Sequence, residues 1–450
     1  MASQKDEWSS HFGFLMAAIA SAVGLGSIWR FPYLVGSYGG SAFIIMYTLL
    51  VIIVGVLGLA VEISIGRNGG TDAVHSYTAI EPKSKLFSYI GIITGFTVMT
   101  FYSLIGGWIL HYLYKSITFS LSSLSSDHFG QFIASDAALY WQLIFIGLTS
   151  FVIMKGVSQG IEKYSKSMNI LLFILIVAIT IRSVTLPNSI EGIMFLINPD
   201  FTIFKDRSIW LMAIGQAFFS LSLGMTIMVT YGCYVPKSIN IVKSSFVVAI
   251  STLFIAILMG FAIFPAVFAL GFDPAGGTGL LFNVLPQVFT AMPFGGPIFA
   301  ILFFIATFFA AITSTISLIE PVVARVIKIS GLSRTRSTIL VTIILITLSV
   351  PVAFSFGRLS HITIFGSNIF NSLDFVTDKI LLPFNAIVTF ILAGWFWKSN
   401  GFIKEITNQG TLKIPFQPII TWMIKVILPA IIGILLISNL KPMLLSIINQ

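Results

Sequence analysis

The sequence predicts an all-α membrane protein that crosses the bilayer many times. Of its 450 residues, 56% are hydrophobic and 9% are charged, whereas a soluble protein has about a quarter charged residues. A helix needs about 20 apolar residues to cross the hydrocarbon core. Eleven stretches are long enough: 11–36, 41–67, 86–119, 137–154, 162–185, 208–233, 241–270, 296–327, 338–356, 373–397 and 417–440. We therefore expect a single transmembrane domain over residues 1–450 with about eleven helices.

The distribution of charge predicts the orientation of the chain. With the N-terminus placed in the cytoplasm, 16 of the 25 Lys and Arg residues fall in inner loops. Such an excess is the usual sign of a cytoplasmic side, so the net charge of +9 does not indicate nucleic-acid binding. The single cysteine, Cys233, excludes an internal disulfide and a multi-cysteine metal site. The chain also has no phosphate-binding Gly-x-x-x-x-Gly-Lys loop, which argues against an ATP-driven pump.

The first apolar stretch is interrupted in its middle. Gly24, Leu25 and Gly26 break the helix, and the charged Arg30 follows. Glycine weakens a helix, and the backbone groups that a break releases cannot stay unpaired in hydrocarbon. Such a break is tolerated where it lines a cavity or coordinates a ligand. It therefore predicts a site for a small molecule or an ion near the middle of the membrane.

The sixth stretch has a similar interruption, at residues 220–224. The two breaks open two blocks of five helices, which predicts an inverted repeat with halves at 8–185 and 206–398 and an extra helix at 417–440. Half-helix N-termini attract anions, and half-helix C-termini attract cations. An amino acid bound with a sodium ion suits such a site. Alternatively, the glycines only allow close helix packing, although this does not explain Ser220, Ser222 and Gln216.

Residues 22–32 read A-V-G-L-G-S-I-W-R-F-P and closely resemble the first-helix motif of the neurotransmitter:sodium symporter family. The resemblance continues in order along nearly the whole chain, through residues 39–43, 62–67, 155–163, 215–224, 260–264, 310–314 and 373–375. It implies a LeuT-like fold with helices 1 and 6 unwound at mid-membrane. It also implies a transporter rather than an enzyme, located in a prokaryotic inner membrane, with sodium and an amino acid or related amine as its small-molecule partners.

The resemblance implies two sodium sites of unequal quality. The second site would use backbone carbonyls and hydroxyls from Ala20, Val23, Ala310, Thr313 and Ser314. The first site would use the carbonyl of Ala22 and hydroxyls from Ser27, Ser220 and either Ser251 or Thr252. The family usually has amide side chains where the first site has hydroxyls. We therefore expect a weak or absent first site and transport driven mainly through the second.

The resemblance also implies how a substrate carboxylate would be held. The backbone N–H groups of Leu25 and Gly26 and the hydroxyl of Tyr102 would bind it. Members of the family that bind amines without a carboxylate tend to have Asp at the position of Gly24. Glycine leaves room there and adds no negative charge, which favours an amino-acid substrate.

The remaining pocket residues implied by the resemblance set the class of amino acid. The ammonium group would meet the carbonyls of Ala22, Phe219 and Ser220 and the hydroxyl of Ser222. The side chain would lie among Val98, Ile105, Phe219, Met225, Ser317 and Leu318. This lining is mainly apolar, and methionine adapts to different shapes. We expect a neutral, hydrophobic amino acid of medium to large size.

The same resemblance assigns two gates. At the outer gate, Arg30 would pair with Asp374, with Gln216 between them and Phe219 as a lid. An ion pair inside a membrane is costly and usually functional, although a permanent structural pair is the alternative. The inner gate would use Lys5, Trp8 and Tyr234.

Three further charged residues, Lys328, Glu62 and Glu320, need an interpretation. Lys328 stands where the family has an acidic partner for the inner gate, so it would repel Lys5. Glu62 is expected to accept hydrogen bonds from the broken backbones of spans 1 and 6, although a buried carboxylate could instead carry protons. Glu320 has no assigned role.

The favoured function is sodium-coupled import of an amino acid by alternating access. One alternative is a proton-coupled amino-acid transporter of the same fold. Another is a substrate-gated sensor or channel, but spans 3 and 8 look too apolar to line a pore, and nothing in the chain resembles a signalling domain.

Overall fold

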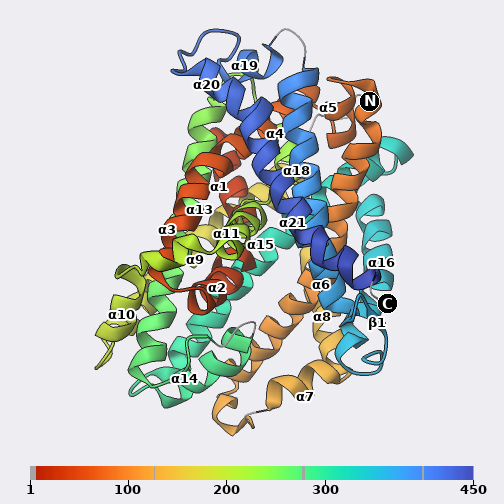
Figure 1. The fold of residues 1–450 in the computed structure, drawn as a ribbon. Coiled ribbons are helices and arrows are strands. Elements are labelled where there is room, and N and C mark those ends of the chain that lie inside the picture. The colour runs from red at the N-terminus through yellow and green to blue at the C-terminus, as the bar shows by residue number, and fades with distance from the viewer. Residues whose placement is uncertain (1–6, 126, 276–278, 398–399, 449–450) are drawn as a thin grey trace.

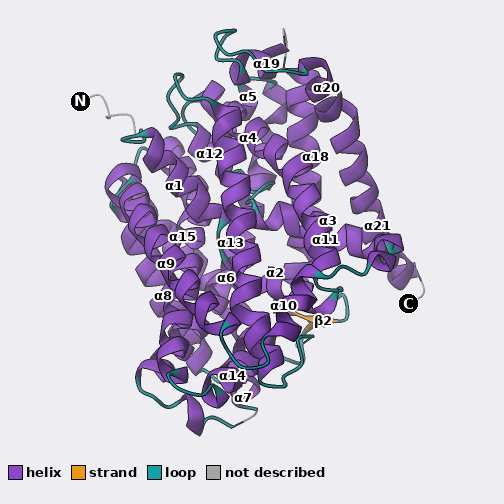
Figure 2. Ribbon diagram, turned by 90° about the vertical axis from the view of Figure 1, so that its left-hand side faces the viewer, coloured by secondary structure: helices purple, strands orange, loops and turns teal. Residues whose placement is uncertain are grey.

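The computed structural model describes residues 7–125, 127–275, 279–397 and 400–448. Long helices run along a common direction and form a bundle (Figures 1 and 2). Within the described residues, nine helices are long and apolar enough to cross a membrane, and a bent pair forms a tenth span. The loop helices α7 and α14 lie at one end of the bundle and α19 lies at the other.

The elements of the first half follow each other with short connections. They are α1 (His11–Ala22), α2 (Phe31–Ser37), α3 (Ser41–Leu50), α4 (Val56–Gly69), α5 (Ala73–Thr78), α6 (Lys85–Ile117), α7 (His128–Ala134), α8 (Ala137–Met154), α9 (Lys163–Val184) and α10 (Ile190–Ile197). Several long helices contain or follow π-helical turns: η1 (Gly26–Arg30) before α2, η2 (Val51–Gly55) between α3 and α4, and η5 (Val157–Glu162) before α9.

The second half is built in the same way. Its helices are α11 (Arg207–Ser220), α12 (Ile227–Gly232), α13 (Ile241–Ala269), α14 (Leu285–Ala291), α15 (Gly296–Ser330), α16 (Arg334–Ala353), α17 (Ile369–Phe375), α18 (Leu382–Ile391), α19 (Gly401–Ile406), α20 (Gln417–Trp422) and α21 (Leu428–Ile448). π-Helical turns η8 (Leu280–Val284), η10 (Val376–Leu381), η11 (Leu392–Phe396) and η13 (Met423–Ile427) extend α14, α17, α18 and α21. The short antiparallel strands β1 (Thr363–Ile364) and β2 (Ser367–Asn368) precede α17.

Each predicted stretch coincides with one long helix or with a pair of shorter ones. Span 1 consists of α1 and the η1–α2 segment, which are bent by 48° relative to each other. Span 6 consists of α11 and α12, separated by residues 221–226. Three residues of this break, Ser222, Gly224 and Thr226, have positive φ angles of 56°, 79° and 57°, a conformation that does not continue a right-handed helix. Both predicted breaks are therefore present.

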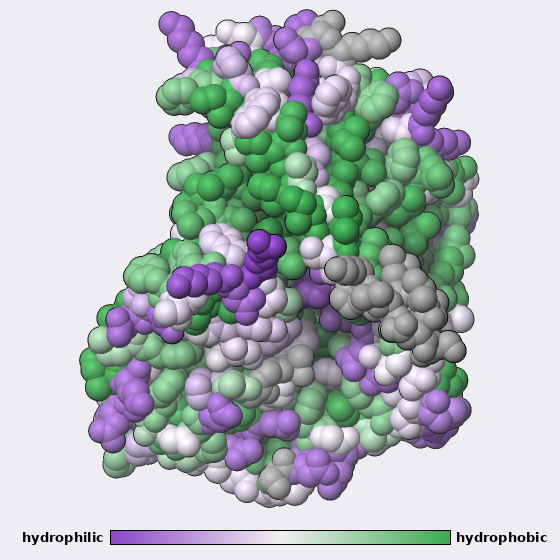
Figure 3. Space-filling model, viewed as in Figure 1, coloured by the Kyte–Doolittle hydropathy of each residue, from purple (hydrophilic) through white to green (hydrophobic). Residues whose placement is uncertain are grey.

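The broken spans lie inside a ring of other helices. α6 and α15 form the centre of the packing and are mostly buried over their apolar segments, whereas the span at 417–440 is largely exposed on its outer side. Apolar side chains gather in a broad band across one face, and hydrophilic ones gather above and below it (Figure 3). This distribution suits a protein whose belt contacts lipid. The division into two repeat halves remains a prediction.

Candidate functional site

The break in span 1 releases backbone groups that find partners on other helices. α1 ends at Ala22, and Val23 has φ −86° and ψ 69°, outside helical values. The backbone N–H of Leu25 donates to the hydroxyl of Tyr102 on α6 at 2.7 Å. The carbonyl of Gly26 accepts from Nε2 of Gln216 on α11 at 2.7 Å. Two of the three predicted carboxylate-binding groups, Leu25 and Tyr102, are therefore in direct contact.

Gly24 is packed too closely for any side chain. A Cβ atom there would lie 2.1 Å from Oγ of Ser314 and 2.6 Å from the hydroxyl of Tyr102. Neither distance is possible without displacing the neighbouring group. Glycine at this position thus lets α15 and α6 bring two hydroxyls to the same point of the broken backbone.

The break in span 6 is held by side chains from α4 and α18. The N–H of Gly224 donates to Oε1 of Glu62 at 2.7 Å, and its carbonyl accepts from Nδ2 of Asn385 at 3.0 Å. The expectation that Glu62 bonds the broken backbones of both spans is correct for span 6 and wrong for span 1. Its other oxygen, Oε2, has no partner among the described residues, because the backbone released in span 1 is bonded by Tyr102 and Gln216 instead.

A small cavity lies between the two breaks. It has an empty volume of about 290 Å³ and is lined by Ser21, Ala22, Gly24, Gly26, Val98, Tyr102, Phe219, Ser220, Ser222, Met225, Ser314 and Leu318. Most of the predicted substrate residues are among them. Leu25, Ile105 and Ser317 do not line it, which corrects their placement, although the N–H of Leu25 bonds the lining hydroxyl of Tyr102. Ile105 is buried on α6 at 1% exposure, and the hydroxyl of Ser317 donates to the carbonyl of Ser314.

Ser21 is a lining residue that the sequence reasoning missed. Its hydroxyl donates to those of Ser222 at 3.1 Å and Ser317 at 2.8 Å. Its carbonyl accepts from the hydroxyls of Ser222 at 3.0 Å and Ser314 at 3.1 Å. One side of the cavity is therefore a connected group of serines from three spans. The sequence signal that could have revealed this group is the presence of four serines in spans 1, 6 and 8.

Ser314, one of the residues predicted for the second sodium site, lies beside Gly24. The hydroxyl of Ser314 lies 3.5 Å from the carbonyl oxygen of Ala20, and the hydroxyl of Thr313 lies 3.2 Å from that of Ala310. Val23 is the residue directly after the end of α1. Cations of this size bind oxygens at about 2.4 Å, so two neighbouring ligands lie about 3.4 Å apart. The Ser314–Ala20 distance, which joins two helices, is close to that value, whereas the Thr313 hydroxyl also donates to the carbonyl of Phe309 on its own helix at 2.8 Å.

The residues predicted for the first sodium site are less well gathered. The hydroxyl of Ser27 lies 3.5 Å from the carbonyl oxygen of Ala22. That of Ser220 lies 2.7 Å from the hydroxyl of Tyr47, and Thr252 donates to its own helix at Val248. Ser251 instead lines a separate, mostly apolar cavity between α1, α9 and α13. The structure thus removes Ser251 from this group, because it faces that cavity.

The outer gate pairs Arg30 with a different carboxylate from the one predicted. Both terminal nitrogens of Arg30 bond Asp378, at 2.8 and 2.6 Å, so the expected pairing with Asp374 is wrong. Asp374 lies on α17 and Asp378 lies one helical turn later, within the π-helical turn η10, which presents it to Arg30. The guanidinium also lies 4.7 Å from the centre of the Phe219 ring. Arg30 and Asp378 are both buried.

Trp8, predicted for the inner gate, packs against the end of span 6. Its ring nitrogen donates to the carbonyl of Tyr231 at 3.1 Å, and its ring packs against those of Tyr231 and Tyr234. The hydroxyl of Tyr234 donates to Glu320 at 3.0 Å, which Arg334 pairs through two nitrogens. Lys5 lies outside the described residues. Lys328 is exposed.

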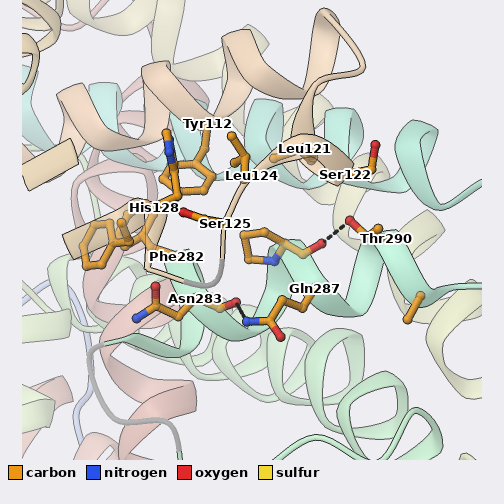
Figure 4. A pocket seen from close by; sticks show the side chains of 13 residues that line it. Tyr112, Leu121, Ser122, Leu124, Ser125, His128, Phe282, Asn283, Gln287 and Thr290 are labelled. Carbon is orange, nitrogen blue, oxygen red and sulfur yellow. Dashed lines mark hydrogen bonds between the residues drawn. The ribbon is translucent and has the colours of Figure 1, made fainter. Parts of the chain in front are cut away.

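The most spacious pockets lie elsewhere. One of about 750 Å³ is formed by the end of α6, residues 121–129 and the η8–α14 segment. In Figure 4, Gln287 donates to the carbonyl of Asn283 one turn earlier on the same segment, and Tyr112, His128 and Phe282 lie on another side of the pocket. It shares no residue with the cavity between the breaks. Cavity size alone therefore does not identify the site that the broken spans build.

Comparisons with known proteins agree with this architecture. A model of the "Sodium:neurotransmitter symporter family" matches residues 5–131 and 123–449. The uncharacterized sodium-dependent transporter YhdH of Bacillus subtilis is 38% identical, over 97% of this chain and 98% of its own. An uncharacterized sodium-dependent transporter of Haemophilus influenzae is 30% identical over the same shares. The crystal structure of MhsT in complex with L-phenylalanine superimposes with a TM-score of 0.89 at 38% identity, covering 97% of this chain and 100% of that one.

Proposed function

The chain belongs to the sodium:neurotransmitter symporter family, and we propose that this integral membrane, sodium-dependent symporter imports a neutral, hydrophobic amino acid by alternating access. The observation that carries the proposal is the contact at Gly24. There the hydroxyl of Ser314, from the proposed ion site, and the hydroxyl of Tyr102, from the proposed carboxylate site, both lie within 2.6 Å of where a Cβ atom would stand. The break in span 1 would therefore serve both the sodium ion and the amino acid.

We propose the second site as the principal sodium site. Its ligands are neutral oxygens, and a hard monovalent cation is bound weakly enough by them to be released on the inner side. Ala20 and Val23 belong to the inner half of span 1, whereas Ala310, Thr313 and Ser314 belong to α15. A bound ion thus joins the two helices. We propose that the first site contributes less, because it offers the hydroxyls of Ser27, Ser220 and Thr252 where the family usually has amide side chains.

The proposed substrate is a zwitterion with an apolar side chain. Its carboxylate would replace the contact between the N–H of Leu25 and the hydroxyl of Tyr102, with Gly26 as a neighbour. Its ammonium would face the carbonyls at Ala22, Phe219 and Ser220 and the hydroxyl of Ser222, and its side chain would face Val98, Met225 and Leu318. The L-phenylalanine of the MhsT complex supports this class, since the two chains are 38% identical.

Closure on both sides of the cavity supports a carrier rather than a channel. Phe219 and the Arg30–Asp378 pair lie above it, and Trp8 with Tyr234 lies below it. An open channel requires a continuous polar path, whereas alternating access requires two gates that open in turn. We propose that the N-terminus faces the cytoplasm of a prokaryotic cell, so that the Trp8 side is the inner gate.

Uptake into proteoliposomes tests the proposal. Purified protein is reconstituted and given a mixture of amino acids under an imposed sodium, potassium or proton gradient, each applied alone. We expect accumulation of leucine, methionine or aromatic amino acids with an inward sodium gradient and none with potassium. Uptake that follows the proton gradient in sodium-free buffer would establish the proton-coupled alternative. Uptake of only charged amino acids would contradict the assignment of the pocket.

A further inference from the structure

A glutamate outside the cavity contacts the first turn of α1. Glu162 ends the π-helical turn η5 and directly precedes α9, and its residue is only 6% exposed. Its carboxylate accepts the backbone N–H of Ser9 at 2.8 Å and the hydroxyl of Ser9. It also accepts the hydroxyl of Ser10 at 3.4 Å. Ser9 and Ser10 directly precede α1, so the carboxylate lies near the end of the helix that attracts negative charge.

Gly13 is what admits the carboxylate to this position. A Cβ atom on Gly13 would lie 1.8 Å from Oε1 and 2.2 Å from Cδ of Glu162. Any other residue at position 13 would therefore push the carboxylate away from α1. Glycine weakens a helix, and here the close approach of a side chain from another span explains its presence.

The contact fixes the part of α1 that carries both proposed sites. α1 supplies Ala20 to the ion site and Ser21 and Ala22 to the cavity. Span 5 holds α1 at two points, through Glu162 at the first turn and through Nδ2 of Asn169, which donates to the carbonyl of Met16 at 2.8 Å. The Trp8 contacts hold the start of α1 to α12 separately.

We propose that Glu162 is a positioning residue of the transport cycle, which holds the inner half of span 1 against span 5 and must release it when the inner face opens. This inference rests on the proposed alternating access. π-Helical turns are often found at functional sites within helices, and Glu162 is the last residue of one. A small rearrangement of that turn moves the carboxylate away from Ser9 without disturbing the rest of α9.

The test measures how often α1 leaves its place. Cys233→Ser removes the single native cysteine, and Ala17→Cys places a reporter on the buried face of α1, where Ala17 is 0% exposed. In sodium without amino acid, we expect the Glu162→Gln variant to react with a maleimide about ten times faster than the parent. The exposed Glu191 on α10 provides a matched control, and the Glu191→Gln variant is expected to react at the parent rate.

Two further variants separate positioning from general loosening. Gly13→Ala breaks the same contact from its other side, so it is expected to speed labelling too, and the double variant is expected to react no faster than the faster single one. A reporter at Ala138→Cys on α8, where Ala138 is 1% exposed, is expected to stay unlabelled throughout. Parent-like labelling of Glu162→Gln, multiplied effects in the double variant, or labelling at position 138 would each overturn the proposal.

The outcome is independent of the substrate assignment, because labelling requires no amino acid. If the labelling pattern appears and hydrophobic amino acids are not transported, the proposed function fails and the role of Glu162 stands. If transport occurs and labelling does not respond to Glu162→Gln, the role of Glu162 alone fails.

Discussion

The guanidinium of Arg30 pairs with Asp378 through two nitrogens, although Asp374 lies one helical turn away on the same segment. Nζ of Lys379 also contacts Asp378, at 2.9 Å. Asp378 therefore joins the segment after the break in span 1 to span 10, directly above Phe219. A buried carboxylate with two cationic partners is therefore the central connection of the proposed outer gate.

Replacing Asp378 is expected to harm the protein more than replacing Asp374. Asp378→Asn leaves the buried Arg30 without its charged partner, and breaking a buried ion pair from one side costs about 3–5 kcal/mol. We expect a lowered melting temperature in detergent and loss of uptake. Asp374→Asn is the matched control and is expected to show a smaller loss of melting temperature and of uptake. Equal losses in the two variants would show that Arg30 uses both carboxylates.

Gly24→Ala is expected to weaken the binding of the amino acid and of sodium together. The new methyl group would displace the hydroxyls of Ser314 and Tyr102, and overpacking of this kind costs about 1–3 kcal/mol. We expect about ten- to hundred-fold weaker binding of amino acid and a parallel loss of sodium affinity, measured by equilibrium binding. Gly147 on α8 has no atom within 4 Å of an added Cβ, so Gly147→Ala should bind as the parent does. Loss of amino-acid binding with sodium affinity unchanged would separate the two sites.

Tyr102→Phe is expected to weaken amino-acid binding specifically. The substitution removes the hydroxyl that would donate to the bound carboxylate, and a hydrogen bond to a charged group contributes about 1.5–3 kcal/mol. We expect about a ten- to hundred-fold increase in the dissociation constant for the amino acid at saturating sodium. Tyr140 is 65% exposed on α8, and Tyr140→Phe serves as the control. An unchanged constant in Tyr102→Phe would exclude Tyr102 from the carboxylate site.

The capping residue of α11 gives a pH-dependent prediction. The side chain of Asp206 accepts the N–H and hydroxyl of Ser208, and these hydrogen bonds hold the pKa of Asp206 below its usual 3.8. A lowered folded-state pKa stabilises the fold above the unfolded-state pKa, and this contribution disappears as the pH falls through the folded-state value. Asp206→Ala should therefore lower the melting temperature slightly at pH 7, with a smaller difference near pH 3. A difference that grows in acid would contradict this account.

The sequence predicts the spans and both breaks, because glycines and serines within apolar runs have a direct physical consequence in lipid. It does not distinguish Asp374 from Asp378, since carboxylates one turn apart differ only in the local winding of η10. Sequence reasoning places Ile105 and Ser317 in the cavity and misses Ser21, because the rotation of each helix about its axis decides which of its residues face the cavity. The contact of Glu162 with Ser9 joins positions 153 residues apart, and no local pattern reports it.

The most direct measurement is a sodium titration of amino-acid binding at constant pH and ionic strength, with potassium replacing sodium. The account predicts that phenylalanine or leucine binds tightly only as sodium rises, with a Hill coefficient near one, and that Ser314→Ala shifts the titration to higher sodium. Binding that is equally tight in potassium, or unaffected by Ser314→Ala, would contradict the claim that one broken region holds ion and amino acid together.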